Sequence, residues 1–284
     1  LLGKTQPAIT SQLKVLSNYV GESVTKRLRH GIILTPIGLS LLKESQQIVR
    51  SIKDVEENIK ELKKNDTGLI RIATSSSIAS YLMPKILGEF YNLNHKIKII
   101  FDLYMSTSEI LKTLYEHQSD IVLFRGQRNN LLPKSIIIKK LFDNEVLLTV
   151  SPHHKLAKLK EVEFKKLDRL EVIKLKIPSG TQRLIDEFEK NKEIKFITKF
   201  TLPEVESAKE AVLNNLGATF LSRLPIEREL KNKTLIGIKL KDIDLQRPVM
   251  MAFHKNDINT VRIQNLIKCI QKVIKLYETN ITKA

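Results

Sequence analysis

The 284 residues, 42% of them apolar, are enough for a small module and a larger two-lobed domain. They include neither an apolar run that could span a bilayer nor a secretory leader, which argues against a membrane partner and against export. A single cysteine, Cys269, excludes an internal disulfide and fits a reducing compartment, and a net charge of +17 favours polyanionic partners or anionic ligands.

The basic residues begin in the first part of the chain. Residues 1–35 contain only Glu22 against five cations, which are Lys4, Lys14, Lys26, Arg27 and Arg29. Lysine, isoleucine and asparagine are abundant throughout, as an AT-rich coding sequence would produce, so charge alone is weak evidence for nucleic-acid binding.

Residues 5–16 predict a helix. Thr5 stands at the N-cap position, Pro7 lies in the first turn, and Ile9, Leu13 and Leu16 share one face. The opposite face carries short polar side chains and a cation that suit a major groove, namely Gln6, Thr10, Ser11 and Lys14. The alternative is an ordinary solvated helix surface.

A β-like run, residues 31–35, ends before Pro36. The segment Thr5-Gln6-Pro7-Ala8-Ile9-Thr10-Ser11-Gln12-Leu13 resembles the recognition helix of LysR-type transcription regulators, and Val20-Gly21, Arg27 and Leu34-Thr35-Pro36-Ile37-Gly38 resemble positions around that family's wing. The resemblance implies a winged helix-turn-helix over residues 1–36. It also implies groove contacts by Thr5, Gln6, Pro7, Thr10 and Ser11, and phosphate contacts by Arg27, Arg29 and His30.

Some positions depart from the family pattern. Thr25 stands where phenylalanine is usual, and His30 where a second arginine is usual. The resemblance also implies that the family's first helix and most of its second, which cover Ile9 and Leu13, precede Leu1. We expect upstream residues to raise affinity for DNA.

Residues 37–66 predict one long helix with a coiled-coil seam. Apolar residues recur at steps of four and three, and the expected dimer contacts are Leu41, Ile48, Ile52, Val55, Ile59 and Leu62, with Ser45 in the same stripe. A second copy of the chain is the simplest partner for this seam, and packing on the chain's own body is the alternative.

From residue 69 the pattern alternates between strands and helices. Strands are expected at 69–73, 97–103, 120–123, 145–150, 170–176, 194–202 and 218–221, and helices at 81–91, 108–117, 181–191, 205–213 and 259–278. The alternation predicts an α/β fold with mainly parallel sheets.

The LysR resemblance continues through Thr67-Gly68-Leu69-Ile70-Arg71-Ile72, Tyr81-Leu82-Met83-Pro84 and Ala211-Val212-Leu213-Asn214-Asn215-Leu216-Gly217. It implies an effector-binding domain over 67–284 like type-II periplasmic binding proteins, with lobe I at 67–144 and 256–284 and lobe II at 145–255. Together with the Ser-Gly-Thr-x-Arg stretch ending at Arg183, the motifs most resemble regulators of carbon-fixation operons, including plastid-encoded ones.

Hydroxyl side chains follow the strands of the predicted lobes, where helix entrances favour anions. The expected effector contacts are Ser75, Ser76, Ser77, Ser106, Thr107, Ser179 and Thr181. Plain N-capping without a ligand is the alternative for each of them.

We find no catalytic motif, metal-site spacing or cofactor fingerprint, and therefore expect no enzyme activity, metal or cofactor. We interpret His153 and His154 as residues of a loop and expect Asp120 to form a structural hydrogen bond. Cys269 is expected to fill space in the core.

The expected protein is a transcription regulator in the cytoplasm or plastid stroma. Its expected partners are double-stranded DNA, a small anionic effector, a second copy in a dimer or tetramer, and RNA polymerase. The rival interpretations are a stand-alone small-molecule binding protein and an architectural DNA-binding protein.

Overall fold

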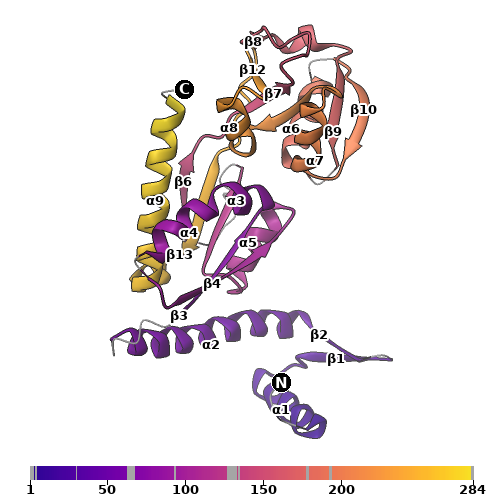
Figure 1. The fold of residues 1–284 in the computed structure, drawn as a ribbon. Coiled ribbons are helices and arrows are strands. Elements are labelled where there is room, and N and C mark those ends of the chain that lie inside the picture. Colours follow the sequence, from indigo (N-terminus) through magenta and orange to yellow (C-terminus); the bar gives the residue numbers. More distant parts are fainter. Residues whose placement is uncertain are drawn as a thin grey trace. The chain divides into compact units, whose positions relative to one another are not determined.

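The computed structural model describes residues 3, 5–29, 31–62, 68–92, 94–126, 133, 135–176, 179–191 and 194–282 (Figure 1). It divides into two compact units, Leu1–Asn65 and Asp66–Ala284, and each is described by itself. Among these residues, no helix combines the length and the apolar character needed to cross a bilayer.

The first unit starts with a helix and a β-hairpin. Helix α1 (Gln6–Val20) ends at Gly21, whose φ of 83° is left-handed. Strand β1 (Thr25–Leu28) pairs antiparallel with β2 (Gly31–Leu34), which confirms the expected strand-like run. The Ser17 hydroxyl accepts a hydrogen bond from the backbone N–H of Val24 at 3.1 Å and ties the helix to the hairpin.

Helix α2 (Pro36–Leu62) follows the hairpin directly and begins with a proline, whose missing N–H would have no helical partner there. The Thr35 hydroxyl accepts from the backbone N–H of Gly38 at 3.1 Å, and the Thr35 N–H donates to the Val24 carbonyl at 3.1 Å. A methyl group on Gly38 would collide with that same carbonyl oxygen. The Leu-Thr-x-x-Gly pattern therefore joins the hairpin to α2.

The expected seam of α2 is largely uncovered. Leu41 is half-buried, whereas Ile48, Ile52 and Val55 are 63%, 56% and 57% exposed. The side chains of Ile59 and Leu62 lie outside the described residues. Such exposed apolar side chains on one helix are typical of a surface that a partner covers.

The second unit contains two lobes. In lobe I the sheet order is β4-β3-β5-β13-β6, with β3 (Gly68–Thr74), β4 (Ile97–Leu103), β5 (Ile121–Arg125), β6 (Ile136–Phe142) and β13 (Val249–His254). Helices α3 (Ser76–Tyr81), α4 (Met83–Tyr91) and α9 (Val261–Thr282) pack in one apolar cluster, and α5 (Thr107–Tyr115) packs in another. Successive β3 residues alternate between them, Ile72 facing the first cluster and Ala73 the second.

Lobe II has the strand order β11-β7-β12-β8 and a separate parallel pair, β10 and β9. A parallel bridge between Val172 and Ala218 connects the two groups. The strands are β7 (Val146–Val150), β8 (Glu161–Val162), β9 (Glu171–Leu175), β10 (Ile197–Leu202), β11 (Thr219–Ser222) and β12 (Ile236–Leu240). The helices are α6 (Gly180–Asn191), α7 (Val205–Leu213) and α8 (Arg223–Lys231), with short 3-10 turns η1 (Phe164–Leu167) and, in lobe I, η2 (Lys255–Asn259).

Two expectations about this unit were wrong. Residues 249–254, assigned to lobe II, form β13 of lobe I, because this strand pairs with β5 and β6. The sheets are mixed and not mainly parallel, because β13 returns antiparallel to its neighbours and β7 pairs antiparallel with β11 and β12. The helix expected at 81–91 is α4, which begins two residues later, and the short helix α3 before it was not predicted.

Candidate functional site

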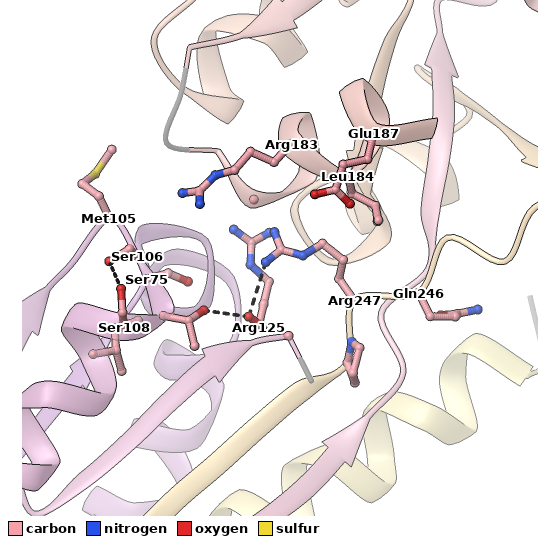
Figure 2. A pocket seen from close by; sticks show the side chains of 15 residues that line it. Ser75, Met105, Ser106, Ser108, Arg125, Arg183, Leu184, Glu187, Gln246 and Arg247 are labelled. Atoms are coloured by element: carbon pink, nitrogen blue, oxygen red, sulfur yellow. Dashed lines mark hydrogen bonds between the residues drawn. The ribbon is translucent and has the colours of Figure 1, made fainter. Parts of the chain in front are cut away.

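A cavity of about 410 Å³ lies between the two lobes (Figure 2). Lobe I contributes residues 105–108, Ser75, Ile110, Arg125 and Gly126, all near strand ends or helix entrances. Lobe II contributes Gly180, Arg183, Leu184 and Glu187 from α6, and the return crossover contributes Gln246, Arg247 and Pro248.

Three arginines dominate the chemistry of this cleft. Figure 2 shows the side chains of Arg125, Arg183 and Arg247 directed into the same space. The only acidic side chain among the described lining residues is Glu187, so the lining carries two more positive than negative charges. Guanidinium groups bind carboxylates and phosphates with paired hydrogen bonds, so the cleft suits an anion with more than one negative charge.

The arginines also act on one another. Burial, and then the positive charge of Arg247, lower the pKa of Arg125 to about 9. Burial and the charge of Arg183 lower the pKa of Arg247 in the same way. Arg125 remains protonated at neutral pH, and a bound anion would relieve the repulsion and stabilise the charged forms of both groups.

The predicted effector hydroxyls divide into two groups. Ser75, Ser106 and Thr107 line the cavity, whereas Ser76, Ser77, Ser179 and Thr181 do not. Ser76 is exposed and Ser77 is buried. The Ser179 hydroxyl accepts a hydrogen bond from the backbone N–H of Gln182 at 3.3 Å. Thr181 does not line the cavity, but its hydroxyl accepts a hydrogen bond from Arg247, which does.

The three lining hydroxyls differ in what they already bind. The Ser106 hydroxyl forms a capping box with Glu109 at the start of α5, as the alternative interpretation expected. The Thr107 hydroxyl donates to the Arg125 carbonyl at 2.9 Å. The Ser75 hydroxyl is buried and has no hydrogen-bond partner among the described residues, so none of them uses its donor or its acceptor.

Sequence reasoning did not predict Arg125 or Arg247. Arg125 ends a buried strand, Ile121-Val122-Leu123-Phe124-Arg125, and ligands of α/β sheets bind beyond the carboxyl ends of such strands. A cation at that position was therefore a usable signal. Arg247, between Gln246 and Pro248, carries no comparable local signal.

The predicted DNA-facing residues of the first unit are all exposed where described: Thr5, Gln6, Pro7, Thr10, Ser11, Lys14, Arg27 and Arg29. Thr5 has the extended N-cap backbone but makes no side-chain cap, and the Thr10 hydroxyl donates to the Gln6 carbonyl at 2.9 Å. His30 lies outside the described residues. Their roles at DNA stay predictions.

Other residues have the structural roles expected of them. The Asp120 carboxylate accepts from the backbone N–H of Arg71 at 2.5 Å, and His154 Nδ1 accepts from the N–H of Leu156 at 3.2 Å. Cys269 is buried in the larger core of lobe I. Across the described part of the chain, no three histidine, cysteine or acidic side chains gather as metal ligands would.

The sequence model of the family described as the LysR substrate binding domain matches residues 63–275. A probable RuBisCO transcriptional regulator of Thalassiosira pseudonana is 29% identical over 252 residues, which cover 87% of this chain and 82% of the relative. The HTH-type transcriptional activator CmpR of Synechocystis is 26% identical over 252 residues, covering 89% and 81%.

Solved structures share the fold. Full-length OxyR from Pseudomonas aeruginosa is 15% identical, with a TM-score of 0.71 and coverage of 94% of this chain and 86% of OxyR. The regulatory domain of Synechocystis CcmR, solved in complex with 2-PG, is 18% identical, with a TM-score of 0.64 and coverage of 74% and 98%.

The lobes have the type-II periplasmic-binding-protein-like fold that the sequence predicted. Neither rival interpretation, a stand-alone binding protein or an architectural DNA-binding protein, agrees with the family match and the named relatives. The chain belongs to the LysR family of transcription regulators, which bind DNA and small-molecule effectors and form multimers.

Proposed function

We propose that the cleft binds a compact multivalent anion that carries a phosphoryl and a carboxylate group, and that this anion regulates transcription of a carbon-fixation operon. The observation that carries the proposal is the excess of two positive charges among the lining residues, with Arg125, Arg183 and Arg247 directed inward.

The chemistry of the cleft supports this choice over a neutral or singly charged ligand. Two of the arginines have lowered pKa values because they are buried near another cation, and a single negative charge would leave part of that repulsion in place. The buried Ser75 hydroxyl can donate to a phosphoryl or carboxylate oxygen. The CcmR regulatory domain, similar in fold, was solved with 2-PG, so 2-phosphoglycolate is the first candidate.

The finer assignments complete the proposal. Gln6, Thr10, Ser11 and their neighbours on α1 read base edges, and Arg27, Arg29 and His30 contact phosphates. Seam residues of α2 join two copies of the chain into a dimer or tetramer that spans two half-sites and works with RNA polymerase. The relative from the alga Thalassiosira pseudonana favours a plastid stroma, with the cytoplasm as the alternative.

Calorimetry on the full chain tests the ligand. We expect 2-phosphoglycolate to bind more tightly than inorganic phosphate, and phosphate more tightly than glycolate. Arg125→Gln should weaken binding by roughly 10- to 100-fold, because a charged hydrogen bond contributes about 1.5–3 kcal/mol. Arg228→Gln is the matched control, since Arg228 is exposed on α8 and lies outside the cleft.

Footprinting on promoter fragments of a carbon-fixation operon tests the regulation. The protected region should change length when 2-phosphoglycolate is added, and the Arg125→Gln protein should protect DNA without that change. Equal binding of all three anions, or a footprint that ignores them, would contradict the proposal.

A further inference from the structure

The two segments that join the lobes lie side by side. The backbone N–H of Arg247 donates to the carbonyl of Asn144 at 3.0 Å, and the N–H of Val146 donates to the carbonyl of Leu245 at 2.8 Å. Glu145 and Gln246 form an antiparallel bridge between these hydrogen bonds. The crossovers therefore form one hinge, and Arg247 is part of its backbone.

The side chain of Arg247 leaves this hinge and enters the cleft, where it contacts both lobes. Its Nη2 donates to the Arg125 carbonyl of lobe I at 3.3 Å (Figure 2). Its Nη1 donates to the Thr181 hydroxyl of lobe II at 3.5 Å. Both distances are long for hydrogen bonds to neutral acceptors, so these contacts are weak. A charged acceptor would attract the guanidinium more strongly.

Gly180, the first residue of α6, supplies the space for this guanidinium. A methyl group on Gly180 would lie 2.5 Å from both terminal nitrogens of Arg247. The backbone of Gly180 does not have the left-handed conformation that would itself favour glycine. Gly180 therefore leaves room for the guanidinium in this position, and a side chain there would require the flexible end of Arg247 to move.

We propose that Arg247, seated against Gly180, is the residue that couples binding of the multivalent anion in the cleft to the angle between the lobes. This inference rests on the proposed function and adds its regulation. In this structure, Arg247 links the Arg125 carbonyl to the Thr181 hydroxyl. A bound anion takes over these donors, and because the backbone of Arg247 is hydrogen-bonded within the hinge, displacement of its side chain changes the hinge.

Such a device satisfies the thermodynamic condition for regulation. A ligand shifts a conformational equilibrium only when it binds one arrangement more tightly than the other. Here the anion gains the Arg247 donors only in the arrangement in which they have left the carbonyl and the hydroxyl.

The test uses the full chain with 2-phosphoglycolate and inorganic phosphate as probes. Binding is measured by calorimetry, and lobe movement by the distance between spin labels on cysteines introduced at two exposed lysines, Lys112 of α5 and Lys190 of α6. In the otherwise unchanged protein, saturating 2-phosphoglycolate should shift the label distance. Arg247→Gln should weaken binding about tenfold and abolish the shift even at saturation.

Gly180→Ala supplies a second, independent variant. It should reproduce the effects of Arg247→Gln, because the methyl group displaces the guanidinium, and it should add no further effect when Arg247 is already glutamine. Gly88→Ala is the matched control, since nothing lies within 4 Å of a methyl group there. If the two substitutions lowered the affinity for 2-phosphoglycolate additively, Gly180 would not act through Arg247, and the inference would be wrong.

Two different outcomes separate the coupling role of Arg247 from the assignment of the ligand. A normal label shift in saturated Arg247→Gln protein would overturn the coupling role and leave the ligand assignment intact. Absence of binding by the unchanged chain would overturn the ligand assignment itself.

Discussion

At the scale of single residues, two helical glycines have opposite surroundings. A methyl group on Gly38 would collide with the carbonyl oxygen of Val24, whereas one on Gly88 would have nothing within 4 Å. We predict that Gly38→Ala lowers the free energy of unfolding of the first unit by about 1–3 kcal/mol, because the hairpin must move. Gly88→Ala should raise stability by about 0.4–1 kcal/mol. Urea denaturation followed by circular dichroism measures both, and equal effects would contradict the packing described for Gly38.

At the scale of elements, the entrances of α3 and α5 use their serines differently. The Ser106 hydroxyl accepts from the backbone N–H of Glu109 at 3.2 Å, whereas Ser75 makes no side-chain cap. We predict that Ser106→Ala costs about 1 kcal/mol of stability and leaves the affinity for 2-phosphoglycolate unchanged. Ser75→Ala should change stability by less than about 0.5 kcal/mol, because its buried hydroxyl has no partner among the described residues, and should weaken binding several-fold. If Ser75 were the cap and Ser106 the ligand contact, thermal unfolding would show the larger loss of stability for Ser75→Ala. Calorimetry would then show the larger loss of affinity for Ser106→Ala.

At the scale of the whole molecule, the exposed seam of α2 is the proposed contact between two copies of the chain. Ile52 is 56% exposed on this helix, and a carboxylate there could not be buried against a second copy without a large desolvation cost. We predict that Ile52→Asp converts the assembled protein to monomers in sedimentation velocity. Lys53→Asp, on the neighbouring and exposed position, should leave the assembly intact. An unchanged assembly in the Ile52→Asp protein would instead favour packing of the seam on the chain's own body.

Much of the fold could be predicted because local patterns were strong. The bounds expected for the strand at 97–103 and the helix at 205–213 agree with β4 and α7. Helix α3 was missed, because its six residues are too few to show a helical period. Residues 249–254 were placed in the wrong lobe and their strand β13 was not predicted, because an apolar run does not indicate which sheet receives it.

The candidate site was only partly predictable. Hydroxyls at helix entrances were expected, and Ser75, Ser106 and Thr107 do line the cavity. Capping and ligand binding use the same residue types at the same positions, so the pattern could not separate Ser106, which caps α5, from Ser75, which does not cap α3. The arginines that set the charge of the cleft were missed.

The sequence alone determined the LysR family and most helices and strands. It also determined the order of the N-terminal helix and hairpin, the long helix and the two-lobed domain. These features depend on motifs and periodicities within short stretches of the chain. Only the tertiary structure decided which residues form the cleft. Arg125 and Arg247 are 122 positions apart and meet because β13 returns beside β5 and places the crossover at the strand end. Such long-range pairing depends on sheet order and chain crossing, which no local pattern specifies.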